Sequence, residues 1–267
     1  MNASVIVAGA RTPIGKMSGA LASQSAADLG GAAITEALTR ANVEPDQVDY
    51  VVMGQVHMAG QGQVPSRQAA VKAGIPMRVP AVNVNKVCLS GLNAIDLAHQ
   101  MIAMGDAEIV VAGGMESMTN APYLAQGARG GFRYGNTELE DSIIRDGLWC
   151  AFDSCLMGLG TDRYTGDAIS REEMDEISAA SHERAATAIK DGILADEIAP
   201  ISIPQRKGDP VLVEHDEGVR PGTTAESLGK LRPAFDPEGS ITAGNASQIS
   251  DGGSAVVVMS KAAAEAN

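Results

Sequence analysis

The feature that most constrains the fold is an apolar run that changes into a helical pattern at a cysteine. The run AVNVNKV over residues 81–87 indicates a buried strand with short polar interruptions. Apolar residues then recur at the spacing of a helix, and Gly105 ends the pattern. The helical positions are Leu92, Ala94, Ile95, Ala98, Met101 and Ile102. Cys88 therefore lies in the turn between a strand and a helix.

The position of Cys88 suits a nucleophile. The first N–H groups of a helix lack partners within the helix and its dipole is positive there, so a thiolate is favoured. A thiolate, and not a thiol, is the attacking species. Ser90 and Gly91 add little bulk, so a substrate could approach the sulfur closely. The alternative is that Cys88 is a small buried hydrophobic residue, and the residues alone leave both interpretations open.

The rest of the core pattern alternates strands with helices. A helix is expected after Ser25, which forms a capping-box pattern with Asp28, and the segment Asn42 to Pro45 ends it. Alternation of this kind indicates an α/β fold with a mixed or parallel sheet that is buried on both faces. The other expected strands are Ser4–Ala8, Val48–Met53, Ile109–Ala112 and Ser254–Met259, and a short helix is expected over Ser66–Ala73.

The sequence changes character between about Thr119 and Thr242. This stretch holds the glycine-rich sequence GARGGFRYG, a short amphipathic run over Asp141–Leu148 and a polar helical pattern over Arg171–Lys190, followed by six prolines. It is too long for a plain loop. We therefore predict an inserted subdomain over residues 119–242, with residues 1–118 and 243–267 forming the core domain.

Charge and cysteine content narrow the class of protein. The net charge of −13 argues against nonspecific binding to nucleic acid or to acidic membranes, although a local basic pocket could still hold a polyphosphate. No apolar run approaches the roughly 20 residues of a membrane span, and MNASVIVAGARTP lacks the basic segment of a secretory signal. Three cysteines do not make a disulfide framework. We predict a cytoplasmic, reduced protein.

The remaining cysteines and the histidines favour structural roles. Cys150 and Cys155 have four residues between them and no companion histidines, so no metal site is expected. The four histidines each have an ordinary explanation: His99 is expected to pack in the core helix, His182 to lie on an exposed helix, and His57 and His215 to lie in turns.

Four stretches together resemble the thiolase family. VNKVCLSGLNAI resembles its acyl-enzyme signature, and GARTPIGK, VVAGGMESMTNAP and KLRPAFDPEGSITAGNASQISDGGSA occur in the family's order. The resemblance covers essentially the whole chain. It implies a thiolase-like βαβαβαββ core half with an inserted loop subdomain that covers the active site and holds coenzyme A (CoA). In the family this half packs against a second, similar half.

The resemblance implies an acyltransferase that performs reversible Claisen condensation or thiolysis between acyl-CoA and acetyl-CoA, in lipid and fatty acid metabolism. Cys88 would carry the acyl group as a thioester, which splits one hard step into two easier ones. The family's activating histidine lies in a Gly-His-Pro motif and its second cysteine in a Cys-x-Gly motif, and the sequence contains neither. We therefore expect an N-terminal part, a fragment or a separately encoded piece, that lacks the second core half and alone is inactive or half-reactive.

The resemblance also implies where CoA binds, as a substrate and not as a permanent cofactor. Arg220 would lie near the phosphates, where a fixed cation is useful, and Ser227 near the adenine. The other matching positions would line the pantetheine route: Leu148, Met157, Ala234, Phe235, Ala243 and Ser247. The partners implied are the C-terminal thiolase domain and further copies of the chain in a homodimer or tetramer, in which GARGGFRYG would join dimers.

Two questions stay open at this point. Short-chain biosynthetic thiolases commonly carry His-Met-Gly where this chain has Leu156-Met157-Gly158, so the acyl chain length is undetermined. The alternative functions are a non-catalytic fragment that binds acyl-CoA and a ketosynthase-like condensing enzyme. The sequences GGMESMTNAP and GNASQISDGG argue against the ketosynthase.

Overall fold

The computed structural model describes residues 3–267, and these divide into two compact units. The core unit contains the described residues up to Pro122 together with Glu197–Glu217 and Ser250–Asn267. The inserted unit contains Tyr123–Asp196 and Gly218–Ile249. The insertion predicted over residues 119–242 therefore differs from the inserted unit: residues 119–122 and 197–217 belong to the core unit, and residues 243–249 belong to the inserted unit. Residues 197–217 contact the core unit in two ways: Arg11 pairs with Glu197 and Asp216, and Ile201 and Val213 pack with Leu21 and Leu29.

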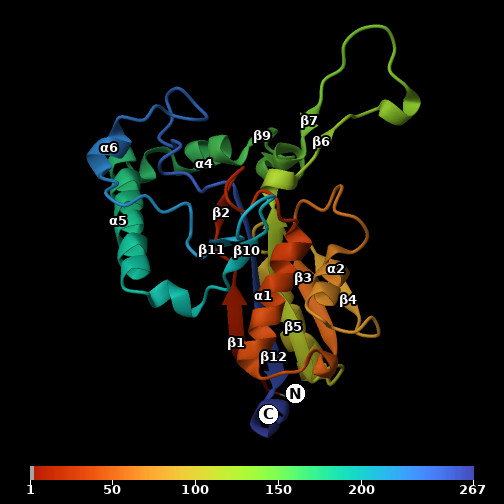
Figure 1. The fold of residues 1–267 in the computed structure, drawn as a ribbon. Coiled ribbons are helices and arrows are strands. Elements are labelled where there is room, and N and C mark those ends of the chain that lie inside the picture. Colours follow the sequence, from red (N-terminus) through yellow and green to blue (C-terminus); the bar gives the residue numbers. More distant parts are fainter. Residues whose placement is uncertain (1–2) are drawn as a thin grey trace. The chain divides into compact units, whose positions relative to one another are not determined.

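The core unit is built on one mixed sheet in the order β1-β12-β5-β3-β4, with β2 paired to β12 (Figure 1). β3 is parallel to both β4 and β5, while β12 is antiparallel to β1, β2 and β5. The last strand of the chain is therefore central in the sheet. The bounds are β1 Ser4–Arg11, β2 Gly15–Lys16, β3 Tyr50–Gly54, β4 Ala81–Val84, β5 Ile109–Ser117 and β12 Ser250–Ser260.

Helices cover both faces of this sheet, which explains why its strands read as continuous apolar runs. Helices α1 (Ala26–Ala41) and α2 (Pro65–Lys72) pack with Val51 and Met53 on one face. Helix α3 (Ser90–Met104) packs with Val52 on the opposite face. Successive residues of a strand point to opposite faces, so β3 contributes to both cores.

Local signals set the helix ends as predicted. Ser25 and Asp28 form a complete capping box, and Asn42 ends α1 in the left-handed conformation. Gly105 ends α3 in the same way. The remaining elements of the core unit are short: η1 Pro45–Gln47, η2 Met118–Asn120, β10 Ile201–Ile203, β11 Val211–Val213 and α7 Lys261–Ala266.

The inserted unit combines short helices with two-stranded ladders. α5 occupies Arg171–Lys190 as predicted, and its Arg171 donates hydrogen bonds to the carbonyls of Leu228 and Leu231. Strands β6 and β7 form the base of a long arm (Figure 1). The bounds are β6 Tyr123–Leu124, η3 Ala128–Gly130, β7 Glu140–Asp141, a π-helical turn η4 Ile143–Leu148, β8 Trp149–Cys150, β9 Cys155–Leu156, α4 Met157–Thr165, η5 Gly166–Ala168, η6 Ile193–Asp196 and α6 Ala225–Gly229.

Within residues 3–267, none of the helices has the length and apolar character needed to cross a bilayer. His99 is exposed and not packed as expected, because its ring meets the hydroxyl of Ser4 at the start of the edge strand β1, with Nδ1 2.8 Å from Oγ.

Candidate active site

Cys88 lies two residues before the first residue of α3, in the turn that follows β4, and it is exposed. Ser90 holds this turn together. Its Oγ accepts a hydrogen bond from the Lys86 N–H at 2.8 Å and donates one to the Val87 carbonyl at 2.6 Å. The sequence suggested only that Ser90 is small, whereas the structure shows that its hydroxyl fixes the chain on both sides of the turn.

Val87, directly before the cysteine, has a strained backbone. Its φ of 51° lies in the left-handed region, which is strongly disfavoured for a β-branched residue. Strain of this kind persists only where the surroundings impose it, and it is concentrated at functional sites. The Ser90 hydrogen bond to the Val87 carbonyl is one of the contacts that impose it here.

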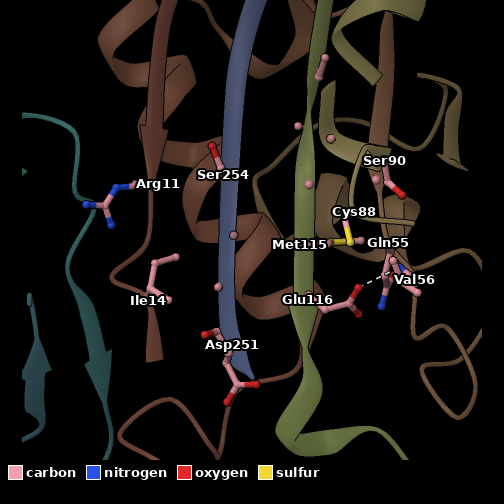
Figure 2. Close-up of a pocket in the computed structure, with 18 of the residues that line it drawn as sticks. Arg11, Ile14, Gln55, Val56, Cys88, Ser90, Met115, Glu116, Asp251 and Ser254 are labelled. Atoms are coloured by element: carbon pink, nitrogen blue, oxygen red, sulfur yellow. Dashed lines mark hydrogen bonds between the residues drawn. The ribbon is translucent and has the colours of Figure 1, made fainter. Parts of the chain in front are cut away.

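Cys88 opens into a cavity of about 430 Å³ in the core unit (Figure 2). Most of its remaining walls come from residues 54–56 at the end of β3, residues 112–116 of β5 and residues 250–254 of β12. Glycines permit the close packing of these walls. A Cβ on Gly54 would lie 2.5 Å from the Ser90 carbonyl carbon, and one on Gly113 would collide with the Ser254 carbonyl oxygen.

Glu116 is an acidic residue in this cavity that the sequence analysis did not single out. Figure 2 shows its carboxylate pointing toward Val56, whose N–H it accepts at 2.8 Å, and it also accepts the N–H of His57 at 3.2 Å. Burial raises the pKa of Glu116 and outweighs those hydrogen bonds and the nearby His57, which lower it. The only sequence signal was its place at the end of a buried strand that carries two glycines.

His57 lies in the irregular segment after β3 and is buried, with 4% of its surface exposed. Neither ring nitrogen has a hydrogen-bond partner among the described residues. Its backbone N–H is held by Glu116, and its carbonyl accepts a 3.4 Å hydrogen bond from the Gln55 amide. His57 therefore belongs to the interior behind the 54–56 wall.

Arg11 and Asp251 form the charged side of the same cavity. Arg11 binds both carboxylate oxygens of Asp216, at 2.7 and 2.9 Å, and its Nε binds Glu197 at 2.7 Å. Burial alone would raise the pKa of Asp216, but the Arg11 hydrogen bonds and charge and the Ile14 N–H lower it below its ordinary value. The fully buried Asp251 accepts hydrogen bonds from the N–H and the hydroxyl of Thr119.

A second cavity, of about 520 Å³, lies within the inserted unit. Four of the residues that the resemblance assigned to CoA line it together, and Leu156 lies beside them. They are Leu148, Met157, Phe235 and Ser247. The Phe235 ring packs so closely against Gly158 of α4 that a Cβ there would collide with it. Small and apolar residues thus shape a mostly apolar slot.

The other four predicted CoA contacts do not line this slot. Arg220 and Ala243 border a small cavity of about 70 Å³ beside His182, whose Nδ1 accepts the Arg220 N–H at 3.2 Å. Ser227 is exposed and caps α6, since its Oγ accepts the Thr224 N–H and donates to the Thr224 carbonyl. Ala234 donates its N–H to the Ile241 carbonyl at 2.8 Å.

No group of three or more histidine, cysteine or acidic side chains in the described part of the chain could hold a metal ion. Cys150 and Cys155 face each other across the β8–β9 ladder. The chemistry that the side chains of the first cavity themselves offer is that of an exposed thiol at a helix start.

Comparison with known proteins identifies the family. The family model described as "Thiolase, N-terminal domain" matches residues 4–262. A probable acetyl-CoA acetyltransferase of Mycolicibacterium smegmatis is 55% identical over 262 residues, which cover 98% of this chain and 68% of that protein. An acetyl-CoA acetyltransferase of Pseudomonas aeruginosa is 51% identical over 263 residues, which cover 98% of this chain and 67% of that protein.

Solved structures agree with this result. The acetyl-CoA acetyltransferase of Syntrophomonas wolfei superposes with a TM-score of 0.95 at 38% identity, and that of Bacillus anthracis with a TM-score of 0.96 at 37% identity. Each comparison covers 100% of this chain and 67% of the other. The chain belongs to the thiolase family, with the fold of its N-terminal domain, as the sequence motifs predicted.

Proposed function

We propose that this chain carries the acyl-accepting cysteine of an acyl-CoA:acetyl-CoA C-acyltransferase, a thiolase that runs reversible Claisen condensation and thiolysis. The observation that carries the proposal is Cys88, exposed at a rigid turn before α3 and opening into a cavity. Relatives that are 51–55% identical are named acetyl-CoA acetyltransferases or probable ones, which supports the same activity here.

In the proposed reaction, the Cys88 thiolate attacks the thioester carbonyl of an acyl-CoA. A bond forms between Sγ and the carbonyl carbon, the bond to the CoA sulfur breaks, and CoA leaves as the thiol after it takes up the proton that Cys88 lost. Donors and dipoles at a helix start stabilise the negative charge that develops on the carbonyl oxygen. The enolate of acetyl-CoA then attacks the acyl-cysteine, which forms the new carbon–carbon bond and releases the thiolate.

The groups that move protons in this reaction are proposed to lie on a C-terminal thiolase domain. The sequence contains neither the Gly-His-Pro nor the Cys-x-Gly motif that carries them in the family. Relatives named for the reaction extend beyond the matched region, which covers 66–68% of their lengths. We therefore expect complete turnover only when a C-terminal thiolase domain is present.

CoA is proposed to bind to the inserted unit as a substrate. The apolar slot suits the pantetheine arm because Leu148, Met157 and Phe235 form walls and Ser247 offers a polar group. The exposed Arg220 would hold the phosphates and Ser227 would contact the adenine, with Ala234 and Ala243 along the route. Leu156 also lines the slot, and it cannot donate the hydrogen bond that a histidine at this position could donate to the pantetheine arm.

Two wider features belong to the proposal. The arm between β6 and β7 carries exposed Phe132 and Tyr134, which suit a contact between copies of the chain in a homodimer or tetramer. A cytoplasmic role in fatty acid metabolism agrees with three free cysteines. Light scattering of the chain with and without the arm residues 126–138 would test the first point, because loss of the arm should lower the mass of the assembly.

The decisive experiment is intact-mass measurement after incubation with acetoacetyl-CoA. In the reverse of the condensation, the Cys88 thiolate attacks the keto carbonyl, the carbon–carbon bond breaks, and acetyl-CoA leaves after its enolate takes up a proton. We therefore expect one acetyl group on the wild-type chain, none on Cys88→Ser, and one on the matched control Cys150→Ser. An adduct that persists in Cys88→Ser would contradict the assignment of the nucleophile. Binding of CoA without any adduct on the wild-type chain would support the alternative of a fragment that binds acyl-CoA but does no chemistry.

A further inference from the structure

The inserted unit contains two cysteines that the proposed acyl transfer does not use. Strands β8 (Trp149–Cys150) and β9 (Cys155–Leu156) form a short antiparallel ladder, closed by the four-residue turn 151–154. Within this ladder Cys150 and Cys155 are direct partners. Side chains of directly opposed residues lie on the same face of a ladder, so the two thiols are neighbours.

Direct antiparallel partners also have the spacing that a disulfide requires. Their Cα atoms are about 4.5–5.5 Å apart, within the range of about 4.4–6.8 Å that disulfides span. Both cysteines are free in the structure. The turn is well defined, because Ser154 is left-handed with φ 52° and Asp153 contacts Cys150 Sγ through two groups. The sulfur accepts the Asp153 N–H at 3.4 Å and donates to the Asp153 carboxylate at 3.3 Å, so the second contact breaks when the thiolate forms. The hairpin therefore keeps the pair in register while the bond forms.

The two sulfurs differ in their access to solvent. Cys150 is half-buried, whereas Cys155 is buried with 4% of its surface exposed. Cys155 packs against α4, since a Cβ on Gly160 would lie 3.7 Å from its Sγ. A small oxidant therefore reaches Cys150 first, and Cys155 is placed to react with the product.

We propose that Cys150 and Cys155 are a modification site, at which a peroxide forms a reversible disulfide. The Cys150 thiolate attacks hydrogen peroxide, the O–O bond breaks, one water leaves and a sulfenic acid remains. The Cys155 thiolate then attacks the Cys150 sulfur, so that the S–S bond forms, the S–O bond breaks and a second water leaves. The two sulfurs supply the two electrons that reduce the peroxide.

The hairpin borders the apolar slot, so this bond has a structural consequence. Leu148 precedes β8, Leu156 lies in β9 and Met157 begins α4, and all three line the slot. A disulfide would fix the two strands to each other and restrict the movement of this wall. The inference rests on the hairpin alone and does not depend on the acyl transfer proposed for Cys88.

The test uses the wild-type chain, treated with hydrogen peroxide, alkylated under denaturing conditions and digested with trypsin. No lysine or arginine lies between Arg145 and Arg163, so both cysteines fall on one tryptic peptide. The expected product is that single peptide, lighter by two hydrogens and without alkyl groups, with full alkylation restored by dithiothreitol. A peptide joined to the Cys88 peptide, or sulfinic acid on Cys150 beside alkylated Cys155, would overturn the proposal.

A second readout is optical. The single tryptophan of the chain, Trp149, precedes Cys150 on β8. Disulfides quench indole fluorescence, so peroxide should lower the emission of wild-type and Cys88→Ser proteins equally, and dithiothreitol should restore it. Cys155→Ser should instead trap the sulfenic acid on Cys150, which dimedone labels. Unchanged, reversible quenching in Cys155→Ser would contradict the assignment.

Discussion

The two cavities differ in kind. The cavity in the core unit is lined by the thiol of Cys88 and by the charged residues Glu116, Arg11 and Asp251. Glycines allow the backbone segments around it to pack closely. The slot in the inserted unit is mostly apolar, and its polar groups are few and neutral. The first offers reactive chemistry and the second offers surface for a long flexible ligand. The proposed reaction thus takes place in one cavity and most of the proposed CoA binding in the other. Substitutions in the slot should therefore weaken CoA binding without changing the reactivity of Cys88.

The largest effect is expected from the glycine packing of the core cavity. In Gly113→Ala the new methyl group meets the backbone of β12, so we expect a loss of about 3 kcal/mol in the free energy of unfolding. The neighbouring Gly114→Ala is a matched control, because its nearest contact would be an ordinary 3.5 Å to Gly91 Cα. Urea unfolding measures both variants. Equal stability of the two would show that the β5–β12 contact is not tight.

The next largest effect on stability is expected from the ion pair between Arg11 and Asp216 beside the core cavity. Asp216→Asn removes the charge that binds Arg11 through two hydrogen bonds, and we expect a loss of about 2 kcal/mol at pH 7. Because the folded state lowers the pKa of Asp216, this stabilisation is present above the ordinary aspartate pKa and is lost as the pH falls through the lowered value. The difference in thermal unfolding midpoint between wild type and variant should therefore disappear in acid. A gap that stays constant down to pH 2 would exclude the ionic contribution.

A smaller effect should be confined to the slot. Phe235→Ala removes a ring that forms one wall, and we expect about tenfold weaker binding of CoA in calorimetry, equivalent to about 1.4 kcal/mol. Phe152→Ala is the control, since Phe152 is 96% exposed in the β8–β9 turn. Alkylation of Cys88 by iodoacetamide should be unchanged in both. If Phe235→Ala slowed that alkylation, the proposal that the slot serves CoA binding and not the reactivity of Cys88 would be wrong.

The smallest effect concerns the pH dependence of stability. Burial raises the pKa of Glu116, so the folded state keeps its proton to higher pH than the unfolded state does. Wild-type stability should therefore decline as the pH rises from the ordinary glutamate pKa through the raised value, and Glu116→Gln should lack this decline. The measurement is how steeply the free energy of unfolding changes with pH in each protein, and not the absolute value of that free energy. Parallel curves for wild type and variant would contradict the raised pKa.

Local features of the fold could be predicted from the sequence because local interactions set them. The capping box at Ser25 and Asp28, the end of α3 at Gly105 and the extent of α5 all depend on residues within a few positions of one another. The place of Cys88 before a helix follows from the same kind of pattern. Such signals can be recognised in the sequence without knowledge of the tertiary contacts.

Features that depend on distant residues could not be predicted in this way. Periodicity marked the last strand but not its place between β1 and β5, and it gave no sign that Arg11 would bind Asp216 and hold residues 197–217 in the core unit. The burial of His57, the role of Glu116 and the strain at Val87 likewise arise from packing. The resemblance to the thiolase family supplied the fold where the local patterns stopped.

The position of β12 has a consequence for how the molecule is made. β1 and β5 do not pair with each other, and residues 250–260 fill the gap between them. On the ribosome, β1 and β5 therefore emerge before the strand that pairs with both of them. The edges that β12 will occupy stay unpaired until the whole inserted unit has been synthesised. A nascent chain in that state exposes apolar edges that are prone to aggregation. The arrest of translation before residue 250 should leave a protease-sensitive chain, and release of all 267 residues from the ribosome should make the chain resistant.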